Sequence, residues 1–242
     1  MATTIDVQTR QSVTRPKASS IPPLENGDRL TRIEFERRYE AMPRLKKAEL
    51  IEGVVYIQAA VRFEQHGRPH SDLVTWMGVY RAQTPGTEIG DNTTVRFDPD
   101  NELQPDIFLR IAPDCGGESR NSPEGFIEGA PELIVEIAAS SASFDLHDKL
   151  HVYRRSGVRE YIVWKVLDEE IVWFELQEER FVPIAVADDG LYHSGLFPGL
   201  QLDAAALLNR DMTRVLKSLQ AGIDSSDHTE FVTKLQQATE KK

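Results

Sequence analysis

Cysteine is nearly missing from this chain, since a single residue, Cys115, occurs among 242. One cysteine excludes a disulfide framework within the chain and a zinc site built from several cysteines. Long hydrophobic runs are missing too, because no segment approaches the roughly 18 apolar residues needed to span a bilayer. Residues 1–20 lack the apolar stretch of a signal peptide. These absences predict a soluble, cytoplasmic protein that has no membrane partner.

Basic residues are fewer than acidic ones, with 28 lysines and arginines against 39 aspartates and glutamates and a formal charge of −11. This balance argues against broad, non-specific binding of nucleic acid through a basic surface. It leaves open an enzyme that meets nucleic acid at one local groove. It also leaves open a metal site whose acidic ligands are neutralised on binding.

Hydrophobic residues make up 40% of the chain, which is enough for a sizeable core in one domain. Residues 1–27 are rich in Thr, Ser, Pro and Gln and predict a mobile tail. Residues 211–242 are polar and predict a second tail, partly helical at most. A single domain is therefore expected over residues 28–210.

Periodicity and turn signals predict a mixture of helices and strands between the tails. Helices are expected over 30–43, which opens with a capping box of Thr31 and Glu34, over 68–83, and over 141–157, which ends at Gly157. Strands are expected in a hairpin around Glu52-Gly53, in a strand–turn–strand over 93–111, and over 131–137, 159–164, 170–176 and 180–186. This order predicts an α/β or α+β fold, a mixed sheet flanked by helices with additional β-hairpins.

Three carboxylates occupy unusual positions in this pattern. Glu136 interrupts the apolar run "LIVEIA", which predicts a strand buried on both faces, where an ionised group is costly unless it is paired or bound to a cation. Asp106 follows Pro105 at the start of another apolar strand, and Glu49 lies at the start of the early hairpin. Acids that meet at one point repel each other, and a divalent cation with oxygen ligands offsets that repulsion.

Lys149 is the fourth candidate, because it lies one helical turn before Tyr153 and borders the buried face of its helix. A lysine there can reach a phosphate or an attacking water. Ordinary structural explanations stay open for all four residues. An aspartate behind proline commonly starts a strand, a buried glutamate can pair with an arginine such as Arg96, Arg110 or Arg154, and a helix lysine can be solvated.

Several segments together resemble the bacterial Uma-type family of restriction endonuclease-like proteins, within the PD-(D/E)xK nuclease superfamily. The resemblance covers about residues 28–208 and is carried by "AELIEGVVY", "HSDLVTWM", "QPDIFLR", "PELIVEIAASSASFDLHDKLHVYRRSGVREYIVW" and "LFPGLQL". It implies the restriction endonuclease-like fold and metal-dependent hydrolysis of DNA phosphodiester bonds, with Mg²⁺ as the cofactor and Mn²⁺ as a substitute.

The resemblance also implies a role for each candidate. Asp106 matches the PD aspartate and Glu136 the motif glutamate, both metal ligands, with the backbone carbonyl of Ile137 as an additional ligand. Glu49 matches the early acid that completes or supports the metal shell. Lys149 matches a lysine that positions the attacking water or the phosphate.

His70 and Tyr153 are further candidates for contacts behind these ligands, although a histidine at a helix start also has a structural explanation. The wider superfamily places its lysine two residues after the glutamate, where this chain has Ala138, so Lys149 on the following helix is the expected replacement. The sequence departs from the family at 139–143, Ala-Ser-Ser-Ala-Ser in place of the usual Ser-Pro-Ser. It departs again at Lys165, where an acid is usual. Neither departure removes a proposed ligand.

Two other functions remain open at this point. The same fold can bind nucleic acid or protein without turnover, or its acids can pair with arginines in a structural or assembly protein. A homodimer is expected for the nuclease, because cutting two strands takes two sites and homodimers are the commonest assembly.

Overall fold

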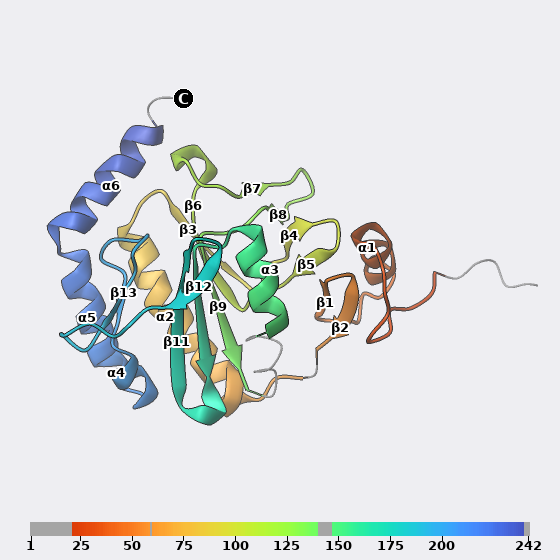
Figure 1. Ribbon diagram of the computed structural model, residues 1–242, viewed down its shortest axis with the longest axis horizontal. Helices are drawn as coiled ribbons and strands as arrows, with labels where there is room; N and C mark the ends of the chain where they lie inside the picture. Colours follow the sequence, from red (N-terminus) through yellow and green to blue (C-terminus); the bar gives the residue numbers. More distant parts are fainter. Residues whose placement is uncertain (1–20, 59, 140–146, 240–242) are drawn as a thin grey trace, which may run out of the picture.

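The computed structural model describes residues 21–58, 60–139 and 147–239 (Figure 1). Its elements form a mixed α+β fold with two six-stranded sheets. Helices cover both faces of the sheet that contains β9 (Leu133–Ala138). This confirms the expected fold class. None of the described helices is long and apolar enough to cross a membrane.

The central sheet holds the strand that contains Glu136. Its strands β9 and β10 run parallel, and all its other neighbours run antiparallel. The spatial order is β12 (Arg180–Pro183), β11 (Glu170–Gln177), β10 (Glu160–Lys165), β9 (Leu133–Ala138), β6 (Ile107–Ile111) and β3 (Thr87–Asp91). The predicted strands at 131–137, 159–164, 170–176 and 180–186 are confirmed as β9 to β12, whereas β3 was not predicted.

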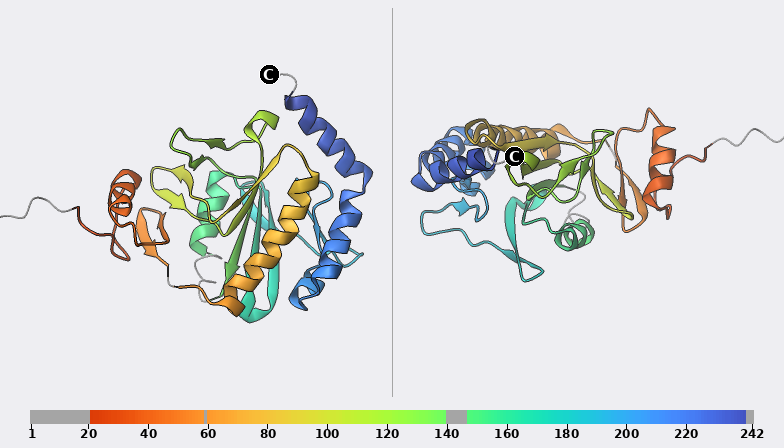
Figure 2. Two further views of the ribbon diagram at one scale, coloured as in Figure 1. Left: turned by 180° about the vertical axis from the view of Figure 1, so that it is seen from behind. Right: turned by 90° about the horizontal axis from the view of Figure 1, so that it is seen from above.

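Alternation along β9 decides which side chains face which layer, because successive strand residues point to opposite faces. Leu133, Val135 and Ile137 pack in the cluster that contains helix α2 (Arg68–Gln83). Ile134 and Ala138 pack on the other face, with residues of α3 (Lys149–Ser156). Glu136 lies between them in sequence and therefore belongs to the α3 face. Figure 2 shows α2 and α3 on opposite sides of the sheet.

The second sheet, called the side sheet, lies beside the central sheet and carries Glu49. Phe35 of α1 (Arg32–Glu40) packs against its Leu50 and Val55. Its spatial order is β2 (Val54–Ile57), β1 (Ala48–Ile51), β5 (Asn101–Leu103), β4 (Val95–Asp98), β8 (Ile127–Glu128) and β7 (Arg120–Asn121).

The predicted strand–turn–strand over 93–111 is instead three strands, β4, β5 and β6. Pro105 separates β5 from β6, because proline has no N–H to donate to a ladder. The short connection between these strands leaves the side sheet and enters the central sheet, and it carries Asp106. The interruption at Pro105 therefore places the carboxylate of Asp106 where the two sheets meet.

Residues 204–239 differ from the polar tail expected at the C-terminus. They form α4 (Ala204–Leu208), α5 (Met212–Ile223) and α6 (Ser226–Thr239), preceded by a small ribbon of β13 (Tyr192–His193) and β14 (Gln201–Leu202). Buried Val215, Leu219 and Ile223 of α5 join the core cluster beside α2, and Leu235 of α6 is buried too. Figure 1 shows these helices at the end of the molecule opposite α1.

Helix ends agree with the sequence in one case and not in the other. The capping box at Thr31 is wrong, because the Thr31 side chain makes no cap hydrogen bond and Glu34 instead accepts from Arg37 and Arg38. Gly157 ends α3 with φ +89°, as predicted. The part of that predicted helix at 141–146, and residues 1–20 of the predicted N-terminal tail, lie outside the described residues. Within 21–27, Leu24 is buried against the side sheet, which differs from a mobile tail.

Candidate active site

Four elements deliver the four predicted catalytic residues to one place. Glu49 comes from β1, Asp106 precedes β6, Glu136 lies on β9, and Lys149 is the first residue of α3. All four line a single cavity of about 670 Å³, together with Ile137. Each side chain is no more than about 4% exposed, so the cavity gathers three carboxylates and an ammonium group that the protein has largely removed from water.

The carboxylate of Asp106, just before β6, is held by the neighbouring strand β9 and by two side chains. Its Oδ2 accepts a hydrogen bond of 2.8 Å from the backbone N–H of Ile137, the residue after Glu136. Its Oδ1 lies 3.3 Å from Lys47 Nζ and 3.2 Å from His66 Nε2. Burial acts to raise the pKa of Asp106, but His66 and Lys47 outweigh it and hold that pKa well below its usual range. Asp106 is therefore ionised and oriented.

Glu136 is held from the face of the sheet that α3 covers. Its Oε1 accepts from Lys149 Nζ at 2.9 Å and from the Tyr153 hydroxyl at 2.7 Å. Lys149 and Tyr153 are four residues apart, so one helix face presents both donors. Ala138 is buried at the position where the wider superfamily has lysine. The expectation that a helix lysine reaches this strand in its place agrees with the structure.

Glu49 is fixed by donors on three sides. Its Oε1 accepts from the backbone N–H of Gln104 at 2.8 Å, and its Oε2 accepts from Gln58 Nε2 at 2.7 Å. The ammonium of Lys149 lies 3.2 Å from the same Oε2. Lys149 therefore bridges Glu49 and Glu136, acids that are 87 residues apart in the sequence.

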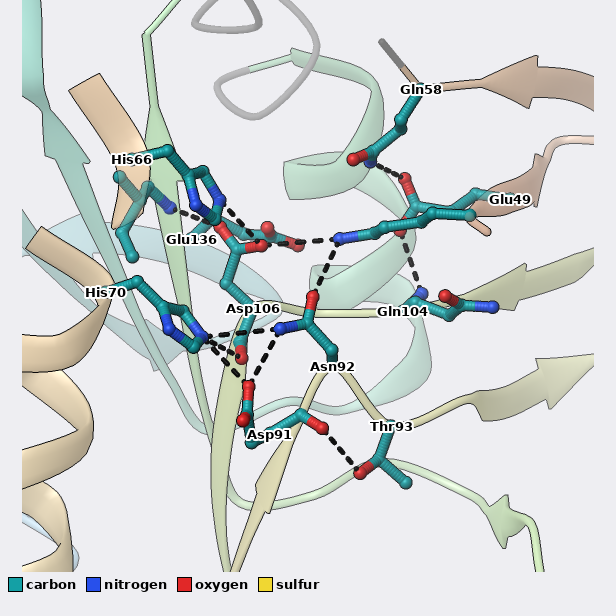
Figure 3. Close-up of polar contacts among 12 residues, drawn as sticks. Glu49, Gln58, His66, His70, Asp91, Asn92, Thr93, Gln104, Asp106 and Glu136 are labelled. Atoms are coloured by element: carbon teal, nitrogen blue, oxygen red, sulfur yellow. Dashed lines mark hydrogen bonds and ion pairs between the residues drawn. The ribbon is translucent and has the colours of Figure 1, made fainter. Parts of the chain in front are cut away.

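Two histidines approach Asp106 from the start of α2, as Figure 3 shows. His66, in the short helical turn η1 (Phe63–Gly67), and His70 lie one helical turn apart, and their rings stack with centroids 5.6 Å apart. His70 Nε2 is 3.2 Å from the backbone oxygen of Asp106 and 2.9 Å from Asp91 Oδ1. His70 therefore contacts the backbone of Asp106, Tyr153 contacts the Glu136 carboxylate, and His66 contacts the Asp106 carboxylate.

The three arginines considered as partners for the buried acids have partners elsewhere. Arg96 pairs with Glu36 at 2.9 Å, and Arg110 pairs with Glu88. Arg154 donates to the backbone oxygen of Glu179 at 2.7 Å. These contacts do not support the alternative in which arginines neutralise the acids of the cavity.

Comparison with known proteins settles the family. The family model Uma2, described as "Putative restriction endonuclease", matches residues 34–205, which is most of the chain. The chain belongs to the Uma2 family. Among solved structures, its fold is similar to that of a "putative nuclease belonging to DUF820" from Anabaena variabilis, with a TM-score of 0.51 and 14% sequence identity. The match covers 76% of this chain and 97% of that one. No curated protein matches.

The donor set of this Uma2 member has the chemistry that Mg²⁺ requires, since carboxylate oxygens are its preferred protein ligands. Among the described residues, however, no three His, Cys, Asp or Glu side chains are grouped closely enough to hold a metal ion. The ammonium groups of Lys47 and Lys149 and the ring of His66 lie on the carboxylate oxygens instead. A divalent cation therefore fits these ligands only if the lysines move away from them.

Lys47 and Gln58 are members of this site that the sequence reasoning missed. Lys47 lies two residues before Glu49, and side chains two apart on a strand share a face. That spacing was visible in "LKKAEL", but a lysine beside a short strand is ordinarily solvated. Its contact with Asp106 depends on where the two sheets meet, which a local pattern does not reveal.

Proposed function

We propose that this Uma2-family chain is a magnesium-dependent endonuclease that hydrolyses DNA phosphodiester bonds. The observation that carries the proposal is the meeting of Glu49, Asp106, Glu136 and Lys149 in one cavity, although they come from different segments of the chain. The family match supports the nuclease class. The low exposure of the acids supports a site in which a cation offsets their repulsion.

The proposed roles are those that the family resemblance implies for these residues. Asp106 and Glu136 would hold Mg²⁺ through their carboxylates, with the carbonyl of Ile137 as an additional ligand and with Glu49 bound directly or through water. A cation held there would supply activation of a water molecule and neutralisation of charge on the phosphate. Lys149, once it moves off the carboxylates, positions the attacking water or a phosphate oxygen as a point charge.

Contacts behind these groups keep them oriented. The Tyr153 hydroxyl fixes one oxygen of Glu136. His70 contacts the backbone oxygen of Asp106, and the N–H of Ile137 fixes the carboxylate of the same residue. Such outer contacts set the direction in which a ligand presents its oxygens.

Plasmid cleavage in the presence of Mg²⁺ tests the proposal. Asp106→Ala and Glu136→Ala are expected to abolish cleavage. Glu175→Ala, which removes an acid of β11 outside the cavity, is expected to cleave like the wild type. Equal cleavage by the wild type and both cavity variants would overturn the assignment of the site.

One observation favours a second candidate, a nuclease-fold module that binds nucleic acid or protein without turnover. The carboxylates already lie against the ammonium groups of Lys47 and Lys149 and the ring of His66. Calorimetric titration with Mg²⁺ or Mn²⁺ separates the two candidates. Metal binding by the wild type that is lost in Asp106→Ala supports the nuclease. No binding of Mg²⁺ or Mn²⁺ by the wild type at millimolar metal supports the module.

A homodimer is proposed as the assembly, because two strands need two sites. Light scattering on the purified protein is expected to give twice the chain mass of 27.3 kDa. A mass of one chain across the working concentration range would contradict the dimer.

A further inference from the structure

The catalytic cavity has a second kind of lining that the proposed chemistry does not use. Besides the acids and Lys149, it is lined by the aromatic ring of Tyr56, by Ile57 and by Val61 and Leu167. The amide of Gln65 lines it too. This aromatic and apolar part of the lining suits an organic ring, beside the polar and charged part that suits a phosphate.

Strand register explains why an aromatic ring lies beside the acids. In the antiparallel pair of β1 and β2, Tyr56 is directly opposite Glu49. Directly opposite side chains share a face, with Cβ atoms about 4.5–5.5 Å apart. Gln58, two residues beyond Tyr56 on the same face, donates to Glu49. The ring of Tyr56 is therefore adjacent to the carboxylate of Glu49 within the same cavity.

The size of the cavity and its mouth point the same way. Its volume of about 670 Å³ lies within the range of roughly 300–1,000 Å³ that is usual for whole small-molecule ligands. Val61 is 62% exposed and Leu167 61% exposed, and both line the cavity. Such exposed apolar side chains become buried when a base packs against them, so the mouth suits a nucleotide better than a phosphate alone.

The charges around the cavity favour contact with one or two nucleotides over contact with a long stretch of duplex DNA. The chain carries a formal charge of −11, and a continuous duplex is bound mainly through an extended basic surface. Within the described part of the chain, the cations near the acids include Arg62, which lines the cavity, Lys149 and Lys47. These are enough to meet one or two phosphates beside a stacked base, which is the pattern of single-strand binding.

We propose that this cavity accepts an unpaired nucleotide, whose base packs on Tyr56 while its phosphate lies at the carboxylates. The preferred substrate is then single-stranded DNA, or duplex DNA that contains unpaired nucleotides, rather than continuous duplex. The inference rests on the proposed nuclease function, but its test does not need cleavage.

Binding of 2-aminopurine oligonucleotides in Ca²⁺ buffer tests it. One labelled strand is used alone, opposite a complement that leaves the labelled nucleotide unpaired, and opposite a full complement. The unpaired forms are expected to bind at least about 10-fold more tightly than the full duplex, within the strength of base–aromatic stacking, and to change fluorescence on binding. Equal affinities, or tightest binding of the full duplex, would overturn the inference.

Variants assign the effect to the lining. Tyr56→Ala is expected to lose the preference for unpaired probes, whereas Tyr56→Phe keeps it because the ring remains. Leu167→Ala is expected to weaken the binding of unpaired probes by a smaller factor than Tyr56→Ala does. Val186→Ala, which changes another exposed aliphatic residue outside the cavity lining, is its matched control. Identical behaviour of Leu167→Ala and Val186→Ala, with the preference intact in Tyr56→Ala, would overturn the inference even if one variant folds poorly.

Cleavage assays with the same three substrates and Mg²⁺ separate the two proposals. Cleavage of continuous duplex as fast as of the unpaired forms, by the wild type and Tyr56→Ala alike, overturns the substrate preference and leaves the nuclease intact. Binding that prefers unpaired probes and depends on Tyr56, without cleavage of any substrate, supports the nucleotide pocket and overturns the nuclease.

Discussion

Two buried glutamates lie on the neighbouring parallel strands β9 and β10, and they have opposite surroundings. Glu136 and Glu160 are 2% and 1% exposed. In the register of the two strands, Glu136 is opposite Val163 and Glu160 is opposite Leu133, so the two acids lie three register positions apart. Burial alone therefore does not distinguish the proposed metal ligand from an acid outside the cavity.

Their partners distinguish them. Glu136 lines the cavity and is paired with the ammonium of Lys149. Glu160 is held by neutral donors, namely the Ser194 hydroxyl at 2.9 Å, the Leu196 N–H at 3.0 Å and Trp173 Nε1 at 3.1 Å. Glu160 thus fastens residues 194–196 to the central sheet. In the proposed function, the acid paired with an ammonium group beside a cavity serves chemistry, whereas the acid enclosed by neutral donors serves the fold.

Among the changes that test the difference between Glu136 and Glu160, Glu136→Gln should have the largest effect on DNA cleavage. Cleavage should fall at least about 1,000-fold, beyond the roughly 10- to 100-fold cost of losing an outer contact of a metal ligand. Thermal stability should change little, because Lys149 still pairs with Glu49. Cleavage rates and melting curves check this, with Glu160→Gln as the matched buried glutamate. Comparable losses of cleavage per folded molecule in both variants would erase the distinction.

Lys149→Met should destabilise the fold at neutral pH, because it leaves two buried carboxylates without their shared cation. The expected cost is about 3–5 kcal/mol in the free energy of unfolding. Lys165→Met is the control, since its partner Glu170 is half exposed and such pairs contribute at most about 1 kcal/mol. Denaturant unfolding in EDTA measures both. A Lys149→Met variant as stable as the wild type would mean that the ion pairs in the cavity are not formed.

Glu160 should make stability depend on pH. Burial raises its pKa from 4.5 to about 7, so between these values the folded chain keeps a proton that the unfolded chain has lost. The stabilising contribution is therefore complete below about pH 4.5 and is lost as the pH rises through 7, by about 3 kcal/mol in total. The difference in unfolding free energy between wild type and Glu160→Gln should shrink over this range. A constant difference would contradict the assignment.

Tyr153→Phe should have the smallest effect. It removes the hydroxyl that donates to Glu136 but keeps the ring packed against Tyr161 and Phe97. A stability loss of about 1.5 kcal/mol or less is expected, because Lys149 still donates to the same oxygen. Cleavage should fall by a smaller factor than in Glu136→Gln. A loss as large as that of Glu136→Gln would make Tyr153 a direct participant instead of a positioning residue.

Strong local patterns predicted much of this fold. The apolar run "LIVEIA" predicted a buried strand, and the spacing of Lys149 and Tyr153 predicted that Lys149 borders the buried face of its helix. These features depend on residues close together in the chain.

Contacts between distant segments were not predictable in the same way. Lys47 reaches Asp106 only where the side sheet meets the central sheet, and Glu160 acquires Trp173 and Ser194 from later segments. The C-terminal helices show a different failure. Val215, Leu219 and Ile223 have helical spacing, but the polar residues around them suggested a tail.

The most direct test of the central claim is the anomalous difference map of a crystal soaked in Mn²⁺. The account predicts a peak within coordination distance of the carboxylates of Asp106 and Glu136, with Glu49 bound directly or through water. It also predicts that Lys149 has moved off Glu136. No peak in the cavity at millimolar Mn²⁺, with Lys149 still bridging Glu49 and Glu136, would contradict it.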